Sequence, residues 1–422
     1  MSSEPRTGGG VYTRQNFLSM YLPSITLAIG TGLVIPAIPV YARSFGVSFE
    51  VASLIIIAQQ LGSTLSALPV GLLMDRFGRR NIVLAGPVLL AISSLLMVRA
   101  ESFPELLAYR FIAGVGEQMW RTGRLTMIAD TGALNERGRQ ITTMSAMEST
   151  GRLLSPALGG LLAGFLGIRA PFVAHALLAL ASILPSFKLL RETAPHLSGG
   201  APRSSAARGP EASFVALLTF PILIFFLAQV FASLTRGPIF TGQFNLYGAF
   251  AYDLDPQSIG LMATAATAIS IPISIASGHI MDRFGRKTTL VPGFSLLAVA
   301  MAFMAATAYL EMPLNIFVIA YFCMHASNSI TGGNMQTLGS DIAPENARGR
   351  FYGVWHTLGS VGGPIGTSGF AALSGGVGYW AAFGFIGATA AGAAFILGAL
   401  VHAPKRDERR TTATIPAAPG SG

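Results

Sequence analysis

The chain has 422 residues, of which 51% are hydrophobic and only 11% are charged, and its mean hydropathy is +0.56. Few soluble domains have such a composition, so we expect a membrane protein. The formal net charge of +9 would suit a nucleic-acid partner, but the sorting of basic residues by loop explains it without one. The single cysteine, Cys323, leaves no intrachain disulfide or cysteine metal site to expect.

Long stretches without charged residues recur along the chain, and most match the roughly 20 apolar residues that cross a bilayer as a helix. They are 15–42, 51–74, 81–98, 170–187, 212–235, 256–281, 288–310, 312–340 and 351–404. The last is too long for one crossing, and the Gly-rich segment 374–378 predicts a turn within it. Spans at 104–130 and 140–167 carry charges, the span at 17–41 follows a basic tail, and all three are inferred from continuity. The sequence therefore predicts an all-α membrane protein with twelve transmembrane helices.

The basic residues are distributed unevenly between the loops. An even number of crossings places both termini on one side, and the polar first residues lack the pattern of a cleaved signal, so the first helix is expected to stay. If the N-terminus is cytoplasmic, most Lys and Arg residues lie inside, and the outside loops hold only Arg43, Arg99 and Arg169. This distribution predicts that both termini are cytoplasmic. The expected location is the plasma membrane, which is the inner membrane in cells that have two membranes.

The sequence is internally repeated. GLLMDRFGRR at 71–80 returns as GHIMDRFGRK at 278–287, and Asp130 and Asp341 follow at matching positions. Such duplication predicts two pseudo-symmetric six-helix bundles, as in many secondary transporters. The expected parts are a disordered cytoplasmic tail 1–14, a bundle 15–188, a cytoplasmic linker 189–212, a bundle 213–403 and a disordered cytoplasmic tail 404–422.

The repeated segment resembles motif A of the major facilitator superfamily, Gly-x-x-x-Asp-Arg-x-Gly-Arg-Arg/Lys. Arg110 with Gly114 resembles motif B, and the segment 190–193 after the sixth helix also fits the family. The resemblance covers nearly the whole chain and implies the fold of the twelve-helix drug:proton antiporter branch.

A further segment, 151–160, resembles motif C of the antiporters, with Ser155 where the family usually has Gly. Its matching residues are Gly151, Pro156, Gly159 and Gly160. A partial echo at 359–364 weakens this diagnosis, because small residues at this spacing also simply let helices pack closely.

The resemblance implies that motif A forms a latch at the cytoplasmic face. Asp75 is expected to face the N-terminus of the helix that starts near Phe351, and Arg79 and Arg80 are expected to reach Asp130. The alternative is a positive-inside turn with an Asp cap. The predicted gating residues are Gly71, Asp75, Arg76, Gly78, Arg79, Asp130, Gly278, Asp282, Arg283, Gly285, Arg286 and Asp341.

The span 104–130 carries Arg110, Glu117, Arg121 and Arg124 within about 60° of one another around a helix. Such a charged stripe cannot face lipid, so it is expected to face a central cavity or another helix. Glu117 is predicted to carry the coupling proton, with Arg121 one turn later as its partner. The alternative is a permanently ionised Glu117–Arg121 pair.

Glu148 is the second candidate for the coupling proton, although its spacing also predicts a structural pair with Arg152. Arg124 is expected to lie close enough to Asp130 to extend toward it. Arg236 is expected to contact the substrate, since an unpaired guanidinium facing lipid is costly. The predicted substrate cavity comprises Arg110, Arg121, Arg152, Arg236, Tyr321, His325 and Asn328.

The sequence favours transport over catalysis. Residues 285–288 have Arg where a phosphate-binding loop needs its second Gly, and no catalytic constellation, cofactor site or metal site is evident. We expect a monomeric, proton-coupled transporter that exports a small amphipathic or drug-like compound by alternating access, with the substrate, protons and lipid as its partners.

Two alternatives stay open. The excess of embedded Arg favours uptake of an organic anion by proton symport, and 17–41 lacks the carboxylate that many drug antiporters place there. A non-transporting membrane sensor or scaffold would not need two intact copies of motif A.

Overall fold

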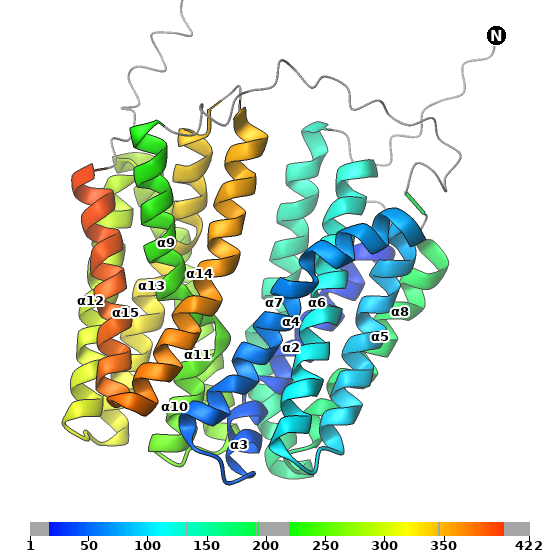
Figure 1. The fold of residues 1–422 in the computed structure, drawn as a ribbon, viewed down its shortest axis with the longest axis horizontal. Coiled ribbons are helices and arrows are strands. Elements are labelled where there is room, and N and C mark those ends of the chain that lie inside the picture. The colour runs from blue at the N-terminus through cyan, green and yellow to red at the C-terminus, as the bar shows by residue number, and fades with distance from the viewer. Residues whose placement is uncertain (1–16, 132–133, 191, 194–218, 345–346, 401–422) are drawn as a thin grey trace, which may run out of the picture. The chain divides into compact units, whose positions relative to one another are not determined.

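The computed structural model describes residues 17–131, 134–190, 192–193, 219–344 and 347–400, and every regular element within them is a helix (Figure 1). The predicted tails, 1–14 and 404–422, and most of the predicted linker lie outside these residues. The chain divides into two units: Met1–Arg208 with Ile239–Ala265, and Gly209–Pro238 with Ala266–Gly422.

The first unit is built from helices that pack along much of their lengths. Helix α6 packs against α4 and α5, α2 packs against α7 and α8, and α5 packs against α8. The elements are η1 (Phe17–Tyr21), α2 (Leu22–Val34), α3 (Ala37–Arg43), α4 (Phe49–Phe77), α5 (Arg79–Val98), α6 (Phe103–Thr131), α7 (Leu134–Leu166), α8 (Ala170–Leu189) and α10 (Gln243–Ala251).

The second unit has a similar composition of long helices, with α12 packed against α13 and α15, and α14 against α15. The predicted turn at 374–378 is confirmed, because α14 ends at Gly376 and α15 begins at Tyr379. The elements are α9 (Phe220–Thr241), α11 (Pro256–Phe284), α12 (Lys287–Tyr309), α13 (Leu314–Ile342), α14 (Arg348–Gly376), α15 (Tyr379–Phe395) and η4 (Ile396–Leu400). The end of α9 from residue 239 and the start of α11 up to residue 265 belong to the first unit.

Residues 239–265 belong to the first unit, whereas the repeat predicted a second bundle from 213 onward. Specific polar contacts account for this difference. Arg43 Nη1 donates to Asp253 Oδ1 at 2.7 Å, and the Ser53 hydroxyl donates to Gln243 Oε1 at 3.0 Å. A break between α9 and α10 at Gly242, whose φ of +88° favours glycine, was not predicted.

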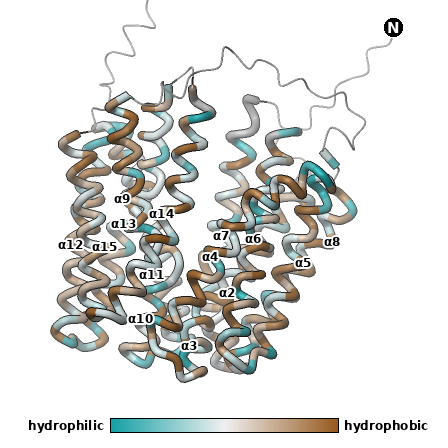
Figure 2. Tube along the Cα trace, in the orientation of Figure 1, coloured by the Kyte–Doolittle hydropathy of each residue, from teal (hydrophilic) through white to brown (hydrophobic). Residues whose placement is uncertain are grey.

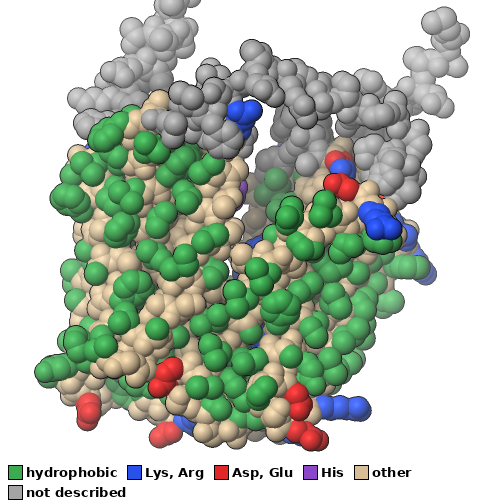
Figure 3. All heavy atoms as spheres, viewed as in Figure 1, with side chains coloured by type: hydrophobic (Ala, Val, Ile, Leu, Met, Phe, Trp, Pro, Cys, Tyr) green, Lys and Arg blue, Asp and Glu red, His purple; other side chains and the backbone are tan. Residues whose placement is uncertain are grey.

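The surfaces of both units suit a lipid environment. Among the described residues, eight helices are long and apolar enough to cross a membrane. Hydrophobic residues run along the helices (Figure 2), and hydrophobic side chains cover much of the face in Figure 3. Leu68, Phe165 and Leu184 are 75%, 78% and 71% exposed, which suits hydrocarbon rather than water. The chain is therefore a multi-pass membrane protein, while the total of twelve crossings stays a prediction, since α6, α7, α13 and α14 are not among the eight.

Glycines allow α4 and α6 to touch along their backbones. A Cβ added at Gly62 would overlap the carbonyl oxygen of Phe111, and one added at Gly114 would overlap that of Gln59. No larger residue fits at either position without moving a helix. The two reciprocal contacts fix how α4 and α6 align.

The motif C glycines lie at further close contacts. Gly151 and Gly159 face the backbone of α2, and Gly160 faces the carbonyl of Pro256 at the start of α11. Ser155, which departs from the family pattern, is accommodated because Gly32 lies opposite its hydroxyl. These contacts are the close helix packing that small residues permit.

Candidate functional site

The turn between α4 and α5 holds a group of ionic contacts that we name the first charge cluster: Arg79, Arg80, Asp130, Glu192 and Thr193. Gly78 makes the turn with a φ of +89°, a conformation that side chains disfavour. It places Arg79 at the start of α5, where its guanidinium forms an ion pair with Asp130 of α6. The sequence had paired these two residues.

Glu192 and Thr193 complete this cluster, although the sequence assigned them no role. The Glu192 carboxylate accepts the backbone N–H groups of Arg79 and Arg80 at 3.0 and 3.1 Å. The Thr193 hydroxyl donates to Asp130 Oδ2 at 2.9 Å. A carboxylate on the unpaired amides at a helix N-terminus is favourable, so Glu192 fastens the start of α5 to the residues after α8. In the sequence, the only feature that could have indicated these roles is that a Glu and a Thr directly follow an apolar span.

Arg80 does not contact Asp130, so that expectation was wrong. Its side chain donates instead to the carbonyls of Leu190 at 2.9 Å and Phe187 at 2.6 Å, and lies over the Phe187 ring. Carbonyls at the C-terminal end of a helix carry partial negative charge, which suits a guanidinium.

Asp75 is exposed and makes no hydrogen bond or ion pair with another described residue. Its expected partner, the start of α14, belongs to the other unit, and that contact stays a prediction. Arg76 lies over the adjacent Phe77 ring, 5.4 Å from its centroid.

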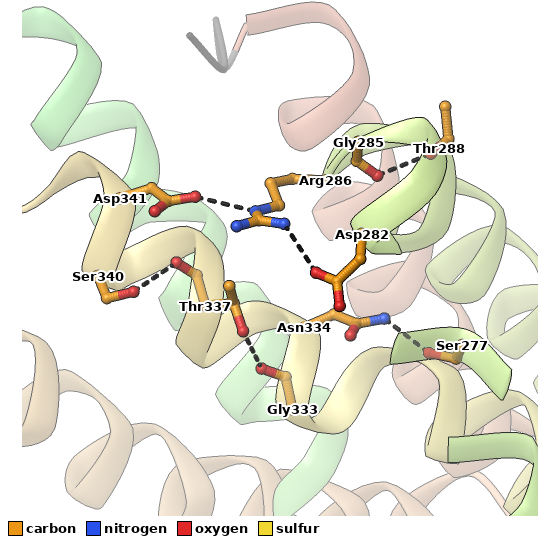
Figure 4. A network of polar contacts seen from close by, with 10 residues as sticks. All are labelled: Ser277, Asp282, Gly285, Arg286, Thr288, Gly333, Asn334, Thr337, Ser340 and Asp341. Atoms are coloured by element: carbon orange, nitrogen blue, oxygen red, sulfur yellow. Dashed lines mark hydrogen bonds and ion pairs between the residues drawn. The ribbon is translucent and has the colours of Figure 1, made fainter. Parts of the chain in front are cut away.

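The second unit repeats this construction in a second charge cluster: Asp282, Arg286, Lys287 and Asp341. Figure 4 shows Arg286 between Asp282 and Asp341. Gly285 makes the turn with a φ of +101°. Arg286 Nε then donates to Asp341 Oδ2 at 2.9 Å, and its Nη1 lies 3.5 Å from Asp282 Oδ1.

The duplication extends to contacts outside the motif. Lys287 Nζ donates to the Gly398 carbonyl of η4 at 3.1 Å, as Arg80 does to the end of α8. Arg283 lies over Phe284 as Arg76 lies over Phe77. Both units therefore use one basic side chain for a carboxylate and the next for a backbone carbonyl at the end of another helix, α8 in the first unit and η4 in the second.

The interior of the first unit contains a chain of polar contacts centred on Gln59 of α4. Buried Arg110 donates through Nη2 to Gln59 Oε1, and Gln59 Nε2 donates to Glu117 Oε2 at 2.8 Å. Gln59 therefore bridges a guanidinium and a carboxylate that both come from α6. The sequence had singled out the two charged residues but not the amide between them.

The expected Glu117–Arg121 pair is absent from the ion pairs of the described residues. Arg121 is exposed and donates to Gln118 Oε1 and to the Ser63 hydroxyl, the latter at 3.2 Å. The Glu117 carboxylate accepts a hydrogen bond from Gln59 instead, and Arg121 donates to the Ser63 hydroxyl on α4. The predicted stripe is therefore divided, with Arg110 and Arg124 buried and Arg121 exposed.

Arg124 and Glu148 form the ion pair at the centre of this unit, with 2.6 Å between Nη2 and Oε1. The expected Glu148–Arg152 pair and the approach of Arg124 to Asp130 were both wrong. Asp130 is already held by Arg79 and Thr193, and Arg152 on α7 is exposed. The contact between α6 and α7 therefore outcompetes partners on the same helix.

The predicted cavity residues of the second unit lie on α9 and α13. Arg236 Nη2 donates to the Thr331 hydroxyl at 2.8 Å, a contact that the sequence did not predict. Tyr321 and His325 lie with their ring centroids 4.5 Å apart, and Asn328 is buried. Spacing along α13 places these residues and Thr331 within one broad face.

Comparisons with known proteins agree with this construction. The Major Facilitator Superfamily model matches residues 21–367 and 239–419. Multidrug resistance protein 2 of Bacillus subtilis (strain 168) is 24% identical over 263 residues, which are 61% of this chain and 65% of that protein. That alignment thus spans slightly less than two thirds of the relative's length.

Two further matches span more of the chain. Tetracycline resistance protein, class C, of Escherichia coli is 27% identical over 368 residues, 83% of this chain and 88% of that protein. The crystal structure of a D-xylose-proton symporter shares the fold, with a TM-score of 0.70 at 16% identity over 92% of this chain and 97% of its own. With the family model matching most of the sequence, the chain belongs to the Major Facilitator Superfamily of transporters.

Proposed function

We propose that this transporter exports a small amphipathic compound in exchange for protons, by alternating access. The observation that carries the proposal is the duplicated charge cluster. Each unit has a positive-φ glycine, an Arg–Asp ion pair, and a basic side chain on the end of another helix, α8 in the first unit and η4 in the second. Two resistance proteins among the relatives and the motif C glycines support the export direction.

We assign the clusters a gating role on the cytoplasmic side. Their ion pairs are partly exposed, and such pairs contribute little to folding stability. They are therefore suited to bias the balance between two conformations. The positive-inside distribution supports cytoplasmic termini in the plasma membrane. A monomer with twelve crossings in two six-helix bundles completes the proposal.

Glu117 is the group to which we assign the coupling proton. Gln59 can hold Glu117 in either protonation state, because an amide offers both a donor and an acceptor. Protonation of Glu148 would break its direct ion pair with buried Arg124, which is costly. Glu117, by contrast, contacts Arg110 only through Gln59. Glu148 therefore receives a structural role in this proposal, although the sequence made it the second candidate.

Proton-driven uptake of an organic anion is the second candidate function. Arg121 and Arg152 are exposed and form no ion pair with another described residue, and neither does Arg236. A surplus of guanidinium groups suits a carboxylate or phosphate on the substrate.

Proteoliposomes with an imposed pH gradient separate these functions. With the interior more acidic than the medium, antiport predicts that ethidium accumulates inside while an internal pH dye reports loss of protons. Symport predicts that 2-naphthoate accumulates only when the gradient is reversed. Folded protein that moves neither solute nor protons would contradict both and favour the sensor or scaffold.

A further inference from the structure

Arg236 is a cation that no carboxylate among the described residues of its unit neutralises. Its Nη2 donates to Thr331, while its Nε is shielded from solvent and has no hydrogen-bond partner. The ion pairs among the described residues of the second unit are both made by Arg286. Among the described residues of this unit, the Arg236 guanidinium contacts the Thr331 hydroxyl and the Phe294 ring, whose centroid lies 5.9 Å away.

The buried arginines of the first unit, unlike Arg236, interact with carboxylates. Arg124 is paired with Glu148, and Arg110 reaches Glu117 through Gln59. An ionised guanidinium in an apolar interior is costly unless an opposite charge compensates it. Arg236 can therefore still bind an anion, whereas Arg124 and Arg110 already interact with carboxylates of the protein.

The surroundings of Arg236 leave room for a ligand group. A Cβ added at Gly332 would lie 4.0 Å from Arg236 Nη2 with no other atom closer, so the glycine leaves one edge of the guanidinium open. Asn328, one turn before Thr331 on α13, is also buried. Arg236 Nε is a shielded donor without a hydrogen-bond partner, which is the kind of atom that an anion can accept from. Unsatisfied buried polar atoms are rare in folded proteins and invite an explanation by an absent ligand.

We propose that Arg236, Thr331 and Asn328 form a binding site for a carboxylate or sulfonate group on an amphipathic organic molecule. The guanidinium binds the two oxygens through its free N–H groups, the Asn328 amide offers a further donor, and Phe294 contacts the apolar part. The assignment of this molecule as cargo rests on the proposed transport function, whereas the binding site does not.

Three isosteric probes that differ in charge test the site: 2-naphthoate, 2-naphthamide and 2-naphthamidine. Titration calorimetry on purified protein in detergent should show naphthoate binding at least about tenfold more tightly than the amide, with the amidine weakest. Arg236→Gln should reduce naphthoate binding by about 30-fold, to the level of the amide. Arg236→Lys should fall between, because Lys keeps the charge but loses the two-pronged geometry.

The control for net charge is Arg99→Gln, which removes an exposed Arg at the end of α5 and should preserve the ranking of the probes. Equal affinity of the wild-type protein for all three probes would contradict the site. A preference for naphthoate that survives Arg236→Gln would do the same.

A steric test leaves Arg236 in place, in case Arg236→Gln does not fold. Gly332→Val should fill the open edge of the guanidinium and abolish the preference for naphthoate. Gly333→Val changes the neighbouring residue, where an added Cβ meets nothing within 4 Å, and should retain the preference. Equal behaviour of the two valine variants would overturn the proposal.

An anionic lipid headgroup presents the same chemistry as a soluble anion, so the titration is repeated in nanodiscs with and without phosphatidylglycerol. Unchanged naphthoate binding supports a soluble ligand, and its loss in phosphatidylglycerol identifies the lipid and contradicts cargo. Anion preference in a protein that moves no protons would reject the proposed transport function and keep the site. Proton-coupled transport without any anion preference would reject the site and keep the proposed transport function.

Discussion

Arg124 of α6 and Glu148 of α7 meet with 2.6 Å between Nη2 and Oε1, and Arg124 Nη1 also donates to the Ser24 hydroxyl of α2 at 2.6 Å. One guanidinium therefore joins three helices of the first unit. The Trp120 ring lies 5.1 Å from the same guanidinium carbon and covers another side of it.

Glu148→Gln should lower the thermal unfolding midpoint of the purified protein, because it leaves Arg124 without its counter-charge. We expect a loss of about 2 kcal/mol, below the value for a fully buried pair, because the Glu148 side chain is 24% exposed. The Arg124→Gln/Glu148→Gln double variant should recover part of the loss. A double variant as unstable as the sum of both single variants would show that the two residues act independently.

Glu117→Gln should uncouple substrate from protons. Gln59 can still donate to the new amide, so the fold should be preserved. In proteoliposomes, exchange of substrate should persist while proton movement and proton-driven accumulation vanish. Undiminished coupling would remove Glu117 from the mechanism and return the role to Glu148.

Asp75→Asn should abolish or strongly slow transport and leave thermal stability within about 0.5 kcal/mol of the wild-type protein. Asp75 is exposed and has no hydrogen-bond or ion-pair partner among the described residues, so its replacement should cost little folding stability. Its loss should act on the balance between conformations. Asp255→Asn is the control. The Asp255 carboxylate lies outside both charge clusters and accepts the backbone N–H of Ser258 at the start of α11, so this variant should leave transport intact. Normal transport by well-expressed Asp75→Asn protein would reject the latch.

Gly114→Val and Gly71→Val should fail in different ways. The valine at 114 would overlap the Gln59 carbonyl, so we expect little folded protein by size-exclusion chromatography in detergent. The valine at 71 meets nothing within 4 Å, so the protein should fold. Lost transport in folded Gly71→Val would place a close contact in another conformation, and normal transport would remove Gly71 from the gating set.

The sequence predicted ionic partners well where the repeat supplied them twice. Arg79 with Asp130 and Arg286 with Asp341 come from matching positions in two copies. It failed where spacing within one helix was the argument, because Glu148 and Arg152 satisfy the i, i+4 rule but α6 presents Arg124 to the same carboxylate.

Residues outside any motif were the hardest to identify. Gln59 is a neutral side chain in an apolar span, and only the packing of α4 on α6 reveals its two partners. The sequence also missed Thr331, because its contact with Arg236 comes from the packing of two helices and a threonine in a membrane helix is not a distinctive signal. Helix positions were more accessible, because apolar length and Gly-rich turns mark them directly.

The contacts of Gln59 also bear on which parts of the protein can move. Its backbone carbonyl rests on Gly114, and its side chain is held between Arg110 and Glu117. A slide of α6 by one turn, about 5.4 Å along the axis, would bring Arg110 or Gln118 beneath that carbonyl and break the side-chain contacts. Helices α4 and α6 must therefore travel as one rigid pair, and sliding motions during transport have to occur at other helix contacts.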